Sequence, residues 1–521
     1  MSPLLWATLA DDLLQRLSFT CLGYADDLAI VIRGRFAGII SERTQMALNI
    51  VHDWCMIEKL SVNAKKTQIV PFTRKRALQG LKPPVLAGTE IPFAKEVKYL
   101  GITFDQKLTW KTHILNTAKK ASIALGRCRR MCGKNWGLNP KMTLWLYTRV
   151  IRPMVTYGSI VWWPKTQQVG AIRLLSGIQR QACLSATGAM RTTPTAAMQV
   201  LLNLPPLHIF VRAEARSVRY RLIQGQPPIT QSHGAEHQRL VKELKENPIT
   251  GMPSDAMAIK YNFNKSYKIV IPDREDWKNG PPVRAETVWY TDGSKTEEGV
   301  GTGIYGQKSK KMISVSLTKE TTVFQAEVAA IHHCVGEINR HNDNNRSIAI
   351  VSDSQATLKA LNSIQVNSKL VWDCAQALND LSQNKKVTLA WVPGHSGHPG
   401  NEKADDLAKQ GSSTAFVGPE PFCGIAKARV RQANQKWIAE ESIRSWEETP
   451  GQRQAKQFIK EPSPKFAEDL LRRDRKSVRA VVGMLTGHCR LRKHMSNMGL
   501  AEEALCRFCN EEEETPLHVL C

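Results

Sequence analysis

Two stretches, Val288-Trp289-Tyr290-Thr291-Asp292-Gly293 and Ile348-Ala349-Ile350-Val351-Ser352-Asp353, each place an aspartate directly after an apolar run. Short runs rich in β-branched and aromatic residues, bounded by polar residues and glycine, are typical of buried strands. If the two strands are parallel neighbours, Asp292 and Asp353 lie at the same edge of the sheet. That edge is where open α/β sheets bind their ligands.

The sequence around these stretches alternates between strand and helix patterns, which indicates an α/β domain. Gly299, Gly301, Gly303 and Gly306 make one strand permissive and suit a hairpin. The predicted fold is a mixed five-stranded sheet with flanking helices. We predict strands at 287–291, 300–306, 311–317, 347–352 and 387–392, and helices at 323–338, 354–363, 367–383 and 400–411.

Two further acids belong to the same domain: Glu327 lies inside a helical pattern, and Asp405 opens the helix that follows 393–397. Four carboxylates that met in an apolar cleft would repel each other unless divalent cations joined them. Mg²⁺ prefers oxygen ligands, and paired metals held by carboxylates commonly break or make phosphodiester bonds. Taken singly, Asp353 could cap a helix, Asp405 could be a surface acid favoured by a helix dipole, and Glu327 could pair with a lysine.

The bulk composition describes a globular chain of 521 residues with a net charge of +25. Residues 1–280 carry +22 of this charge, and residues 101–200 contain fifteen lysines and arginines but one acid, Asp105. Such a segment favours a nucleic-acid partner over a merely solvated helical face. No apolar stretch is long enough for a membrane span, and no secretory signal is evident. The scattered cysteines indicate a reducing, intracellular setting, in the nucleus, the cytoplasm or both.

The central motifs resemble a type 1 ribonuclease H domain over about 283–413. The resemblance implies cleavage of the RNA strand of an RNA–DNA hybrid with two Mg²⁺ or Mn²⁺ ions per site. Asp292, Glu327, Asp353 and Asp405 would be the catalytic metal ligands, and His395 would shuttle protons or assist product release. Alternatively, His395 only orders its loop. The motifs are Thr291-Asp292-Gly293-Ser294, Gln325-Ala326-Glu327, Ser352-Asp353-Ser354-Gln355-Ala356, 391–397 and 400–405.

The N-terminal stretch Tyr24-Ala25-Asp26-Asp27, between two apolar strands in 18–33, resembles the catalytic turn of a reverse transcriptase palm. With the ribonuclease H motifs downstream, the order resembles a jockey-like non-LTR retrotransposon polyprotein. The family's polymerase uses a further aspartate from an upstream strand, and Asp11 and Asp12, in a helical pattern, cannot replace it. We therefore expect Asp26 and Asp27 to be a remnant polymerase site in a truncated palm, without polymerase activity from this chain alone.

The C-terminus contains Cys506, Cys509, His518 and Cys521, which are ligand types of a zinc site. The family ends in a similar cluster, although its last cysteine usually lies further beyond the histidine. The alternative is free thiols and an exposed histidine beside the acidic run 511–514.

The resulting division of the chain has six parts, and two functions compete. The first is a ribonuclease H carried on a truncated retrotransposon polyprotein; the second is a decayed remnant that binds nucleic acid without cutting it. Neither oligomeric state nor sequence preference follows from the residues. The parts are a partial palm (1–105), a basic helical thumb and connection (106–225), a linker (226–282), the ribonuclease H domain (283–413), a helical region (414–500) and a zinc-knuckle-like segment (501–521).

Overall fold

The computed structural model describes residues 2–73, 79–131, 133, 136–224, 234–279, 283–340, 346–419 and 422–520. The chain forms two compact units. Unit 1 comprises 1–158, 165–198 and 465–521, and unit 2 comprises 159–164 and 199–464. Within the described ranges, no helix has the length and apolar character needed to cross a membrane.

Unit 2 is built on a mixed six-stranded sheet with the order β11-β10-β9-β12-β14-β8. Strands β9, β12, β14 and β8 run parallel, and β10 and β11 run antiparallel to their neighbours. The predicted mixed sheet is confirmed, with six strands in place of five. The strands are β8 (Lys268–Val270), β9 (Thr287–Lys295), β10 (Val300–Gly306), β11 (Lys311–Leu317), β12 (Ser347–Ser352) and β14 (Lys386–Trp391).

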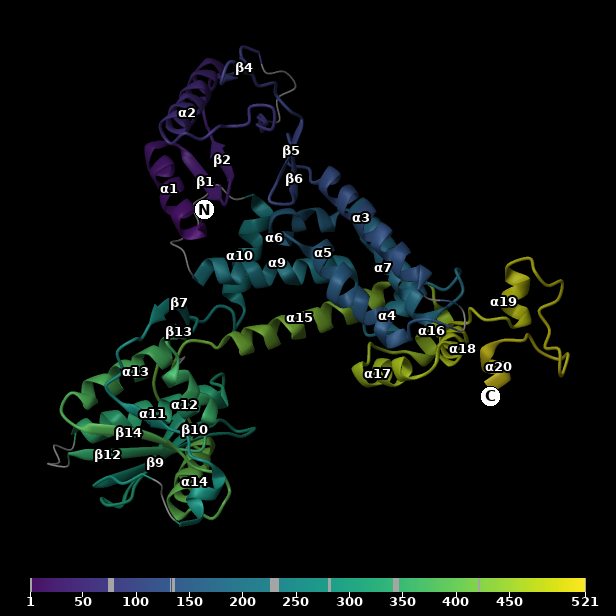
Figure 1. The fold of residues 1–521 in the computed structure, drawn as a ribbon. Helices are drawn as coiled ribbons and strands as arrows, with labels where there is room; N and C mark the ends of the chain where they lie inside the picture. Colours follow the sequence, from purple (N-terminus) through teal and green to yellow (C-terminus); the bar gives the residue numbers. More distant parts are fainter. Residues whose placement is uncertain are drawn as a thin grey trace. The chain divides into compact units, whose positions relative to one another are not determined.

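Helices cover both faces of this sheet, because side chains alternate across each strand. Trp289 and Ile304 point into a core with helices α11 (Val323–Arg340), α12 (Gln355–Asn362) and α13 (Lys369–Ser382). Tyr290 and Tyr305 point to the other face, where they pack with Ala404 of α14 (Pro399–Ser413). Figure 1 shows α11, α12 and α13 grouped together and α14 apart from them.

The glycines of β10 are required by close packing against a helix, which the sequence did not reveal. A Cβ at Gly303 would stand 1.9 Å from the Ala404 carbonyl oxygen, and one at Gly301 would stand 2.3 Å from the Ser412 amide nitrogen. The strand lacks side chains here so that the α14 backbone can lie directly on it. This close packing fixes the helix that carries Asp405.

The segment 226–282 was expected to be a linker, but its described part, 234–279, belongs to the folded unit. It contains α10 (Ala235–Glu246), β7 (Ala256–Tyr261), β8 and the 3₁₀ helix η3 (Arg274–Asn279). Tyr267 donates from its hydroxyl to Leu361 O at 2.9 Å, and Trp277 donates from Nε1 to Trp391 O at 2.9 Å. The polar, proline-rich composition suggested a linker, but two large buried aromatic side chains anchor the segment, Tyr267 to α12 and Trp277 to β14.

The other helices of unit 2 do not belong to the layers that cover the sheet. Trp437 of α15 stacks against the guanidinium groups of Arg212 and Arg216, at 5.4 and 4.6 Å from the ring centroid. This contact joins α15 to α9. The helices are α6 (Ser159–Trp162), α9 (Leu207–Gln224), α10, α15 (Lys427–Glu448) and α16 (Arg453–Phe458).

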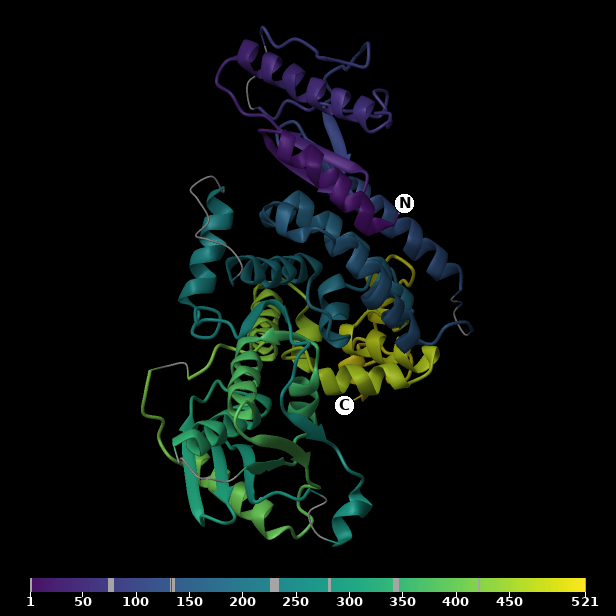
Figure 2. The same ribbon diagram turned by 60° about the vertical axis from the view of Figure 1, so that its left-hand side comes forward.

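Unit 1 begins with a helix, a hairpin and a second helix, and the two helices pack together on one face of the hairpin. The hairpin pairs β1 (Thr20–Tyr24) with β2 (Asp27–Val31), as the sequence predicted. Leu13 and Leu17, at the end of α1 (Pro3–Arg16), form a small core with Val51 and Trp54 of α2 (Ala37–Ile57). Figure 2 shows α1 lying against the hairpin.

After α2 the chain forms two short hairpins and one isolated bridge. Residues 97–104 form a hairpin of β5 (Glu96–Tyr99) and β6 (Ile102–Asp105), because Leu100 and Gly101 both adopt positive φ, at 45° and 81°. Two consecutive positive φ values allow a two-residue turn. Residues 68–72 make only an isolated bridge, between Ile69 and Phe93. Another small hairpin, β3 (Val85–Leu86) with β4 (Thr89–Glu90), lies in the sequence between residues 68–72 and β5.

The basic segment after residue 105 is helical, as predicted, and so is the C-terminal region. Arg475 connects the two within unit 1: it donates to Leu138 O, to Ser185 O and to the Thr143 hydroxyl at 2.7 to 3.0 Å. The helical elements are α3 (Lys111–Arg130), α4 (Pro140–Leu146), the π turn Tyr147–Ile151, α5 (Arg152–Thr156), η2 (Trp163–Gln167), α7 (Val169–Thr187), α8 (Thr195–Leu201), α17 (Pro464–Arg472), α18 (Arg475–Thr486), α19 (Arg492–Asn497) and α20 (Pro516–Leu520).

Candidate active site and metal centres

Three of the predicted acids meet at the edge of the sheet. Asp292, Glu327 and Asp353 each place one carboxylate oxygen within 4.8 Å of the other two. Strands β9 and β12 pair in parallel up to Thr291 and Ser352, so the next residue of each strand is an aspartate at the same level. Glu327 comes from α11, which approaches β9 closely: a Cβ at Gly293 would stand 2.5 Å from the Glu327 amide nitrogen.

The convergence of these acids makes ionisation costly. Burial, followed by the charges of Asp353 and Asp405, raises the pKa of Asp292 to about 7. Burial and the charge of Asp292 also raise the pKa of Glu327 well above its usual range. Burial raises the pKa of Asp353. A bound cation would stabilise the ionised form of these carboxylates, because its charge offsets both the cost of desolvation and their mutual repulsion.

Glu327 is 6% exposed, and its Oε2 atom has no hydrogen-bond partner. Among the described residues, no lysine or arginine forms a salt bridge with it, so the alternative of a structural ion pair finds no support there. A buried acceptor without a donor is expensive to maintain. The orphaned oxygen is therefore consistent with a ligand position for a hard cation.

Asp353 is not the cap of the helix that follows it. The cap of α12 is Ser354, whose side chain accepts from the Thr357 amide. The Asp353 carbonyl accepts from Trp391 Nε1 at 2.9 Å, which fixes the backbone at the strand end. A Cβ at Gly394 would stand 2.8 Å from Asp353 Oδ2, so the loop after β14 lies directly against the carboxylate.

Asn401, in the first turn of α14, is a site residue that the sequence reasoning passed over. Its side chain is 3% exposed and forms a hydrogen bond with Asp353 that lowers the pKa of that carboxyl, partly offsetting the effect of burial. Its Oδ1 atom has no partner. Its position four residues before Asp405, on the same helix face, was the available signal.

Asp405 lies at the margin of the cluster. Its charge raises the pKa values of Asp292 and Asp353, which places it nearby, but its own carboxylate pairs with Lys409 at 2.7 Å. His395 has a positive φ of 51° in the loop after β14, and its charge lowers the pKa of Asp353. The structure therefore brings four acids and the histidine into one neighbourhood, with three of the acids in direct proximity.

The hairpin acids of unit 1 have a different setting. Asp27 pairs with Tyr24 across the turn, and Ala25 adopts a positive φ of 50°. Both Asp26 and Asp27 are exposed. Asp12 lies on α1, as predicted, where its carboxylate accepts from Trp54 Nε1 at 2.9 Å and pairs with Arg16. Within the described ranges, no third acid joins Asp26 and Asp27 in a cluster.

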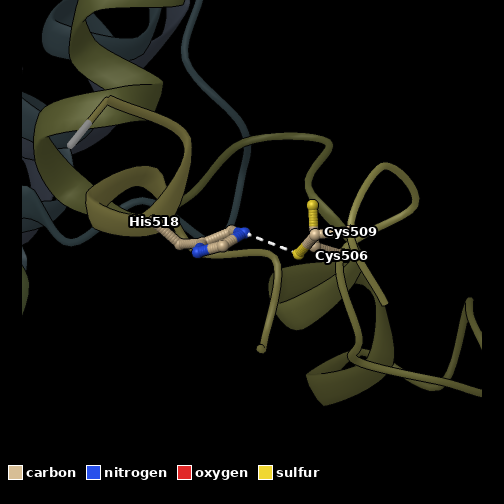
Figure 3. A group of neighbouring side chains, drawn as sticks. All are labelled: Cys506, Cys509 and His518. Atoms are coloured by element: carbon tan, nitrogen blue, oxygen red, sulfur yellow. Dashed lines mark hydrogen bonds between the residues drawn. The ribbon is translucent and has the colours of Figure 1, made fainter. Parts of the chain in front are cut away.

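The C-terminal cluster gathers three of its four predicted ligands. Cys506, Cys509 and His518 place their ligand atoms within 4.8 Å of one another, and Cys509 Sγ lies 3.2 Å from His518 Nε2 (Figure 3). The fourth predicted ligand, Cys521, lies outside the described residues. Hydrogen bonds from the Glu511 and Glu512 amides lower the pKa of Cys509 to about 7, and the two cysteines raise the pKa of His518.

The acidic run beside this cluster is partly structural. Glu514 is 1% exposed and accepts from the Arg492 amide at 2.7 Å and from Arg507 Nε at 2.8 Å. Glu512 lies 3.3 Å from His518 Nδ1, so Nε2 faces the sulfur atoms. A carboxylate that orients a histidine in this way is a common second partner at metal sites. Two thiolates and an imidazole with such support suit Zn²⁺.

The sheet order, the strand-end acids and the α14 helix define a ribonuclease H domain, and comparison with known proteins agrees. Residues 284–413 match the RNase H family, and residues 1–104 match the reverse transcriptase (RNA-dependent DNA polymerase) family. The chain therefore carries a reverse transcriptase region followed by an RNase H domain, and it is similar to non-LTR retrotransposon polyproteins.

Similar proteins include products of type-1 retrotransposable elements R1. The chain is 31% identical over 43% of its length to the 115 kDa protein in the type-1 retrotransposable element R1DM of Drosophila melanogaster, covering 22% of that protein. It is 28% identical over 43% of its length to the Pol polyprotein from element R1 of Nasonia vitripennis, covering 66% of it. It is 30% identical over 38% of its length to the R1 Pol polyprotein of Bradysia coprophila, covering 20% of that protein.

Proposed function

We propose that unit 2 hydrolyses the RNA strand of RNA–DNA hybrids at the Asp292, Glu327 and Asp353 cluster. The observation that carries the proposal is the meeting of three buried carboxylates with raised pKa values, from three separate elements, at the edge of the sheet. Such a group has little structural use, because its members repel each other. It suits the binding of divalent cations beside a phosphodiester.

Each residue has a role that follows from its position. Asp292, central to the cluster, would contact both metal positions, while Glu327 and Asp353 would complete one of them and Asp405 the other. Bound Mg²⁺ or Mn²⁺ would supply a more acidic water and stabilise the leaving oxygen. Asn401 holds the Asp353 carboxylate in place through its side-chain hydrogen bond. His395, in the loop against Asp353, would accept or release a proton near the leaving group.

A cleavage assay with the intact chain tests this proposal. A hybrid with a labelled RNA strand is incubated with Mg²⁺ or Mn²⁺, and the wild type is compared with Asp405→Asn and with Asp406→Asn. Asp406 is the adjacent acid on the same helix and is exposed, so its substitution is a matched control. We expect cleavage by the wild type and by Asp406→Asn, and its loss in Asp405→Asn. Hybrid binding that is sensitive to salt, without cleavage, would instead identify a decayed binding protein.

We propose in addition that the C-terminal cluster binds one Zn²⁺ through Cys506, Cys509 and His518, with Cys521 as the predicted fourth ligand. The proximity of the three ligand atoms and the lowered pKa of Cys509 support this. Metal analysis of the purified chain, with Cys509→Ser as the comparison, measures the stoichiometry.

A further inference from the structure

An exposed two-stranded ribbon lies at the side of the ribonuclease H domain. One of its strands, β7, precedes the residues that match the RNase H family, and the other lies within them. Strand β7 pairs antiparallel with β13 (Gln365–Ser368), with Tyr261 opposite Gln365 and Lys260 opposite Val366. The ribbon lies beside α13 in Figure 1. In the described part of the chain, no strand pairs with the other edge of β7.

The two faces of this ribbon differ. On the inner face, Val366 is buried in the core, and Asn262 is buried and donates from its backbone N–H to Ile364 O. Lys260 Nζ, on the same face, lies 4.8 Å from the centroid of the Trp372 ring. Side chains alternate along a strand. The outer face therefore carries the alternate residues of β7, Ile259 and Tyr261. Phe263, just beyond the strand, continues this face.

These outer side chains are large, apolar and open to solvent. Ile259 is 56% exposed, Tyr261 54% and Phe263 73%. The rings of Tyr261 and Phe263 are almost parallel, with an interplanar angle of 4° and centroids 5.7 Å apart. The inner face already packs on the domain, so no intramolecular requirement of the ribbon explains two parallel aromatic faces on its outer side. Parallel ring faces are the form that stacking platforms for unpaired bases take.

The two sequence segments that form the ribbon carry lysines as their charged residues. Residues 256–271 contain Lys260, Lys265 and Lys268 but no acid, and residues 362–372 contain Lys369 but no acid. Asp255, at the border, is buried, and its carboxylate is used by the Ser368 hydroxyl and the Leu370 amide. The ribbon thus combines exposed aromatic side chains with segments whose charged residues are lysines. This combination fits a polyanion that carries flat apolar groups.

We infer that the outer face of the β7–β13 ribbon binds single-stranded nucleic acid, with bases stacked on Tyr261 and Phe263 and phosphates near the surrounding lysines. The partner is a single strand, because bases in a duplex or hybrid are covered by their own neighbours and cannot stack on a protein ring. Sequence preference is weak, since every base has an aromatic face. This inference goes beyond the proposed hydrolysis and does not depend on it.

Photocrosslinking with the full chain tests the inference. Oligonucleotides of DNA with 5-iodouracil and of RNA with 4-thiouridine are bound in EDTA, irradiated, and the crosslinked peptides are identified. We expect crosslinks at Tyr261 or Phe263 with both. The double variant Tyr261→Ala, Phe263→Ala should lose these crosslinks and bind single strands about tenfold more weakly. The exchange Tyr261→Phe, Phe263→Tyr keeps both rings and should bind as the wild type does.

A matched control is Met312→Ala, because Met312 is also an exposed apolar residue, at 61%, on β11 of the same domain. It should leave binding unchanged, and the alanine double variant should still cleave a short hybrid if the wild type does. Failure of the wild type to cleave would overturn the proposed hydrolysis without touching this result. Crosslinks confined to other segments, with unchanged affinity of the double variant, would overturn the inference. So would a change from dimer to monomer without loss of binding, since the occupant would then be a second copy.

Discussion

Two places in this chain bring a pair of aspartates together on paired strands, and they differ in what surrounds the acids. Asp26 and Asp27 lie in the tip of a two-stranded hairpin and are exposed. Asp292 lies in β9 just beyond its pairing with β12, Asp353 directly follows β12, and Glu327 is supplied by a helix; the pKa values of all three are raised. A hairpin is made by adjacent residues and brings together only adjacent acids. A cluster able to bind a metal ion needs carboxylates from elements that are distant in sequence.

The largest effect is expected from neutralising the centre of the buried cluster. Asp292→Asn should lower cleavage of a hybrid on the order of a thousandfold or more, because a catalytic ligand is lost. The same variant should raise the melting temperature in EDTA, because the substitution removes a buried charge that its neighbours repel. Differential scanning calorimetry and a cleavage assay measure the two quantities. A variant that melts below the wild type in EDTA would show that Asp292 stabilises the fold.

The pH dependence of stability provides a second contrast between the two places. The pKa of Asp292 is raised from 3.8 in the unfolded chain to about 7. A raised carboxyl pKa contributes a cost that is absent below the unfolded value, grows between the two values, and is complete above the folded one. Without metal, the melting temperature should therefore fall as the pH rises from about 4 to about 7. Added Mg²⁺ should restore it above pH 7, and Asp292→Asn should show a smaller fall.

The sequence predicted most of the ribonuclease H domain, because its apolar runs match the strand period and its motifs are local. The prediction that Asp292 and Asp353 lie at the same edge of the sheet needed only the assumption that their strands are parallel neighbours. It could not predict β8 or the anchoring of 254–279, since Tyr267 and Trp277 find their partners about a hundred residues away. Nor could it predict that Glu514 is buried on Arg507, because a run of four glutamates has the composition of a solvated surface.

The glycines of β10 allow a test of how tightly the cluster is held. Gly303→Ala places a Cβ where the α14 backbone lies, so α14 must move and carry Asp405 with it. We expect a loss of roughly 1–3 kcal/mol in the free energy of unfolding, together with reduced cleavage. Gly336→Ala, on α11, is the control: nothing lies within 4 Å of its Cβ. It should stabilise the helix by up to about 1 kcal/mol. Equal effects of the two changes would contradict the close packing.

The zinc-knuckle-like cluster should matter locally. Cys509→Ser should reduce the zinc content of the purified chain well below one per molecule, while cleavage by unit 2 changes by less than about twofold, because each metal site is completed by its own residues. Cys489→Ser is a suitable control, because Cys489 is half-buried and lies outside the cluster. Metal analysis and the cleavage assay report the result. Retention of a full equivalent of zinc by Cys509→Ser would remove this cysteine from the ligand set.

The smallest effect is expected at the hairpin. Asp26→Asn and Asp27→Asn should leave the melting temperature, the pH dependence and hybrid cleavage unchanged, because both side chains are exposed and no third acid of the described chain joins them. Two carboxylates on one turn leave a two-metal polymerase site incomplete. A primed template with labelled nucleotide and Mg²⁺ should therefore show no incorporation by the wild type. Incorporation that Asp26→Asn abolishes would mean that a third ligand reaches the turn, and the contrast between the two places would disappear.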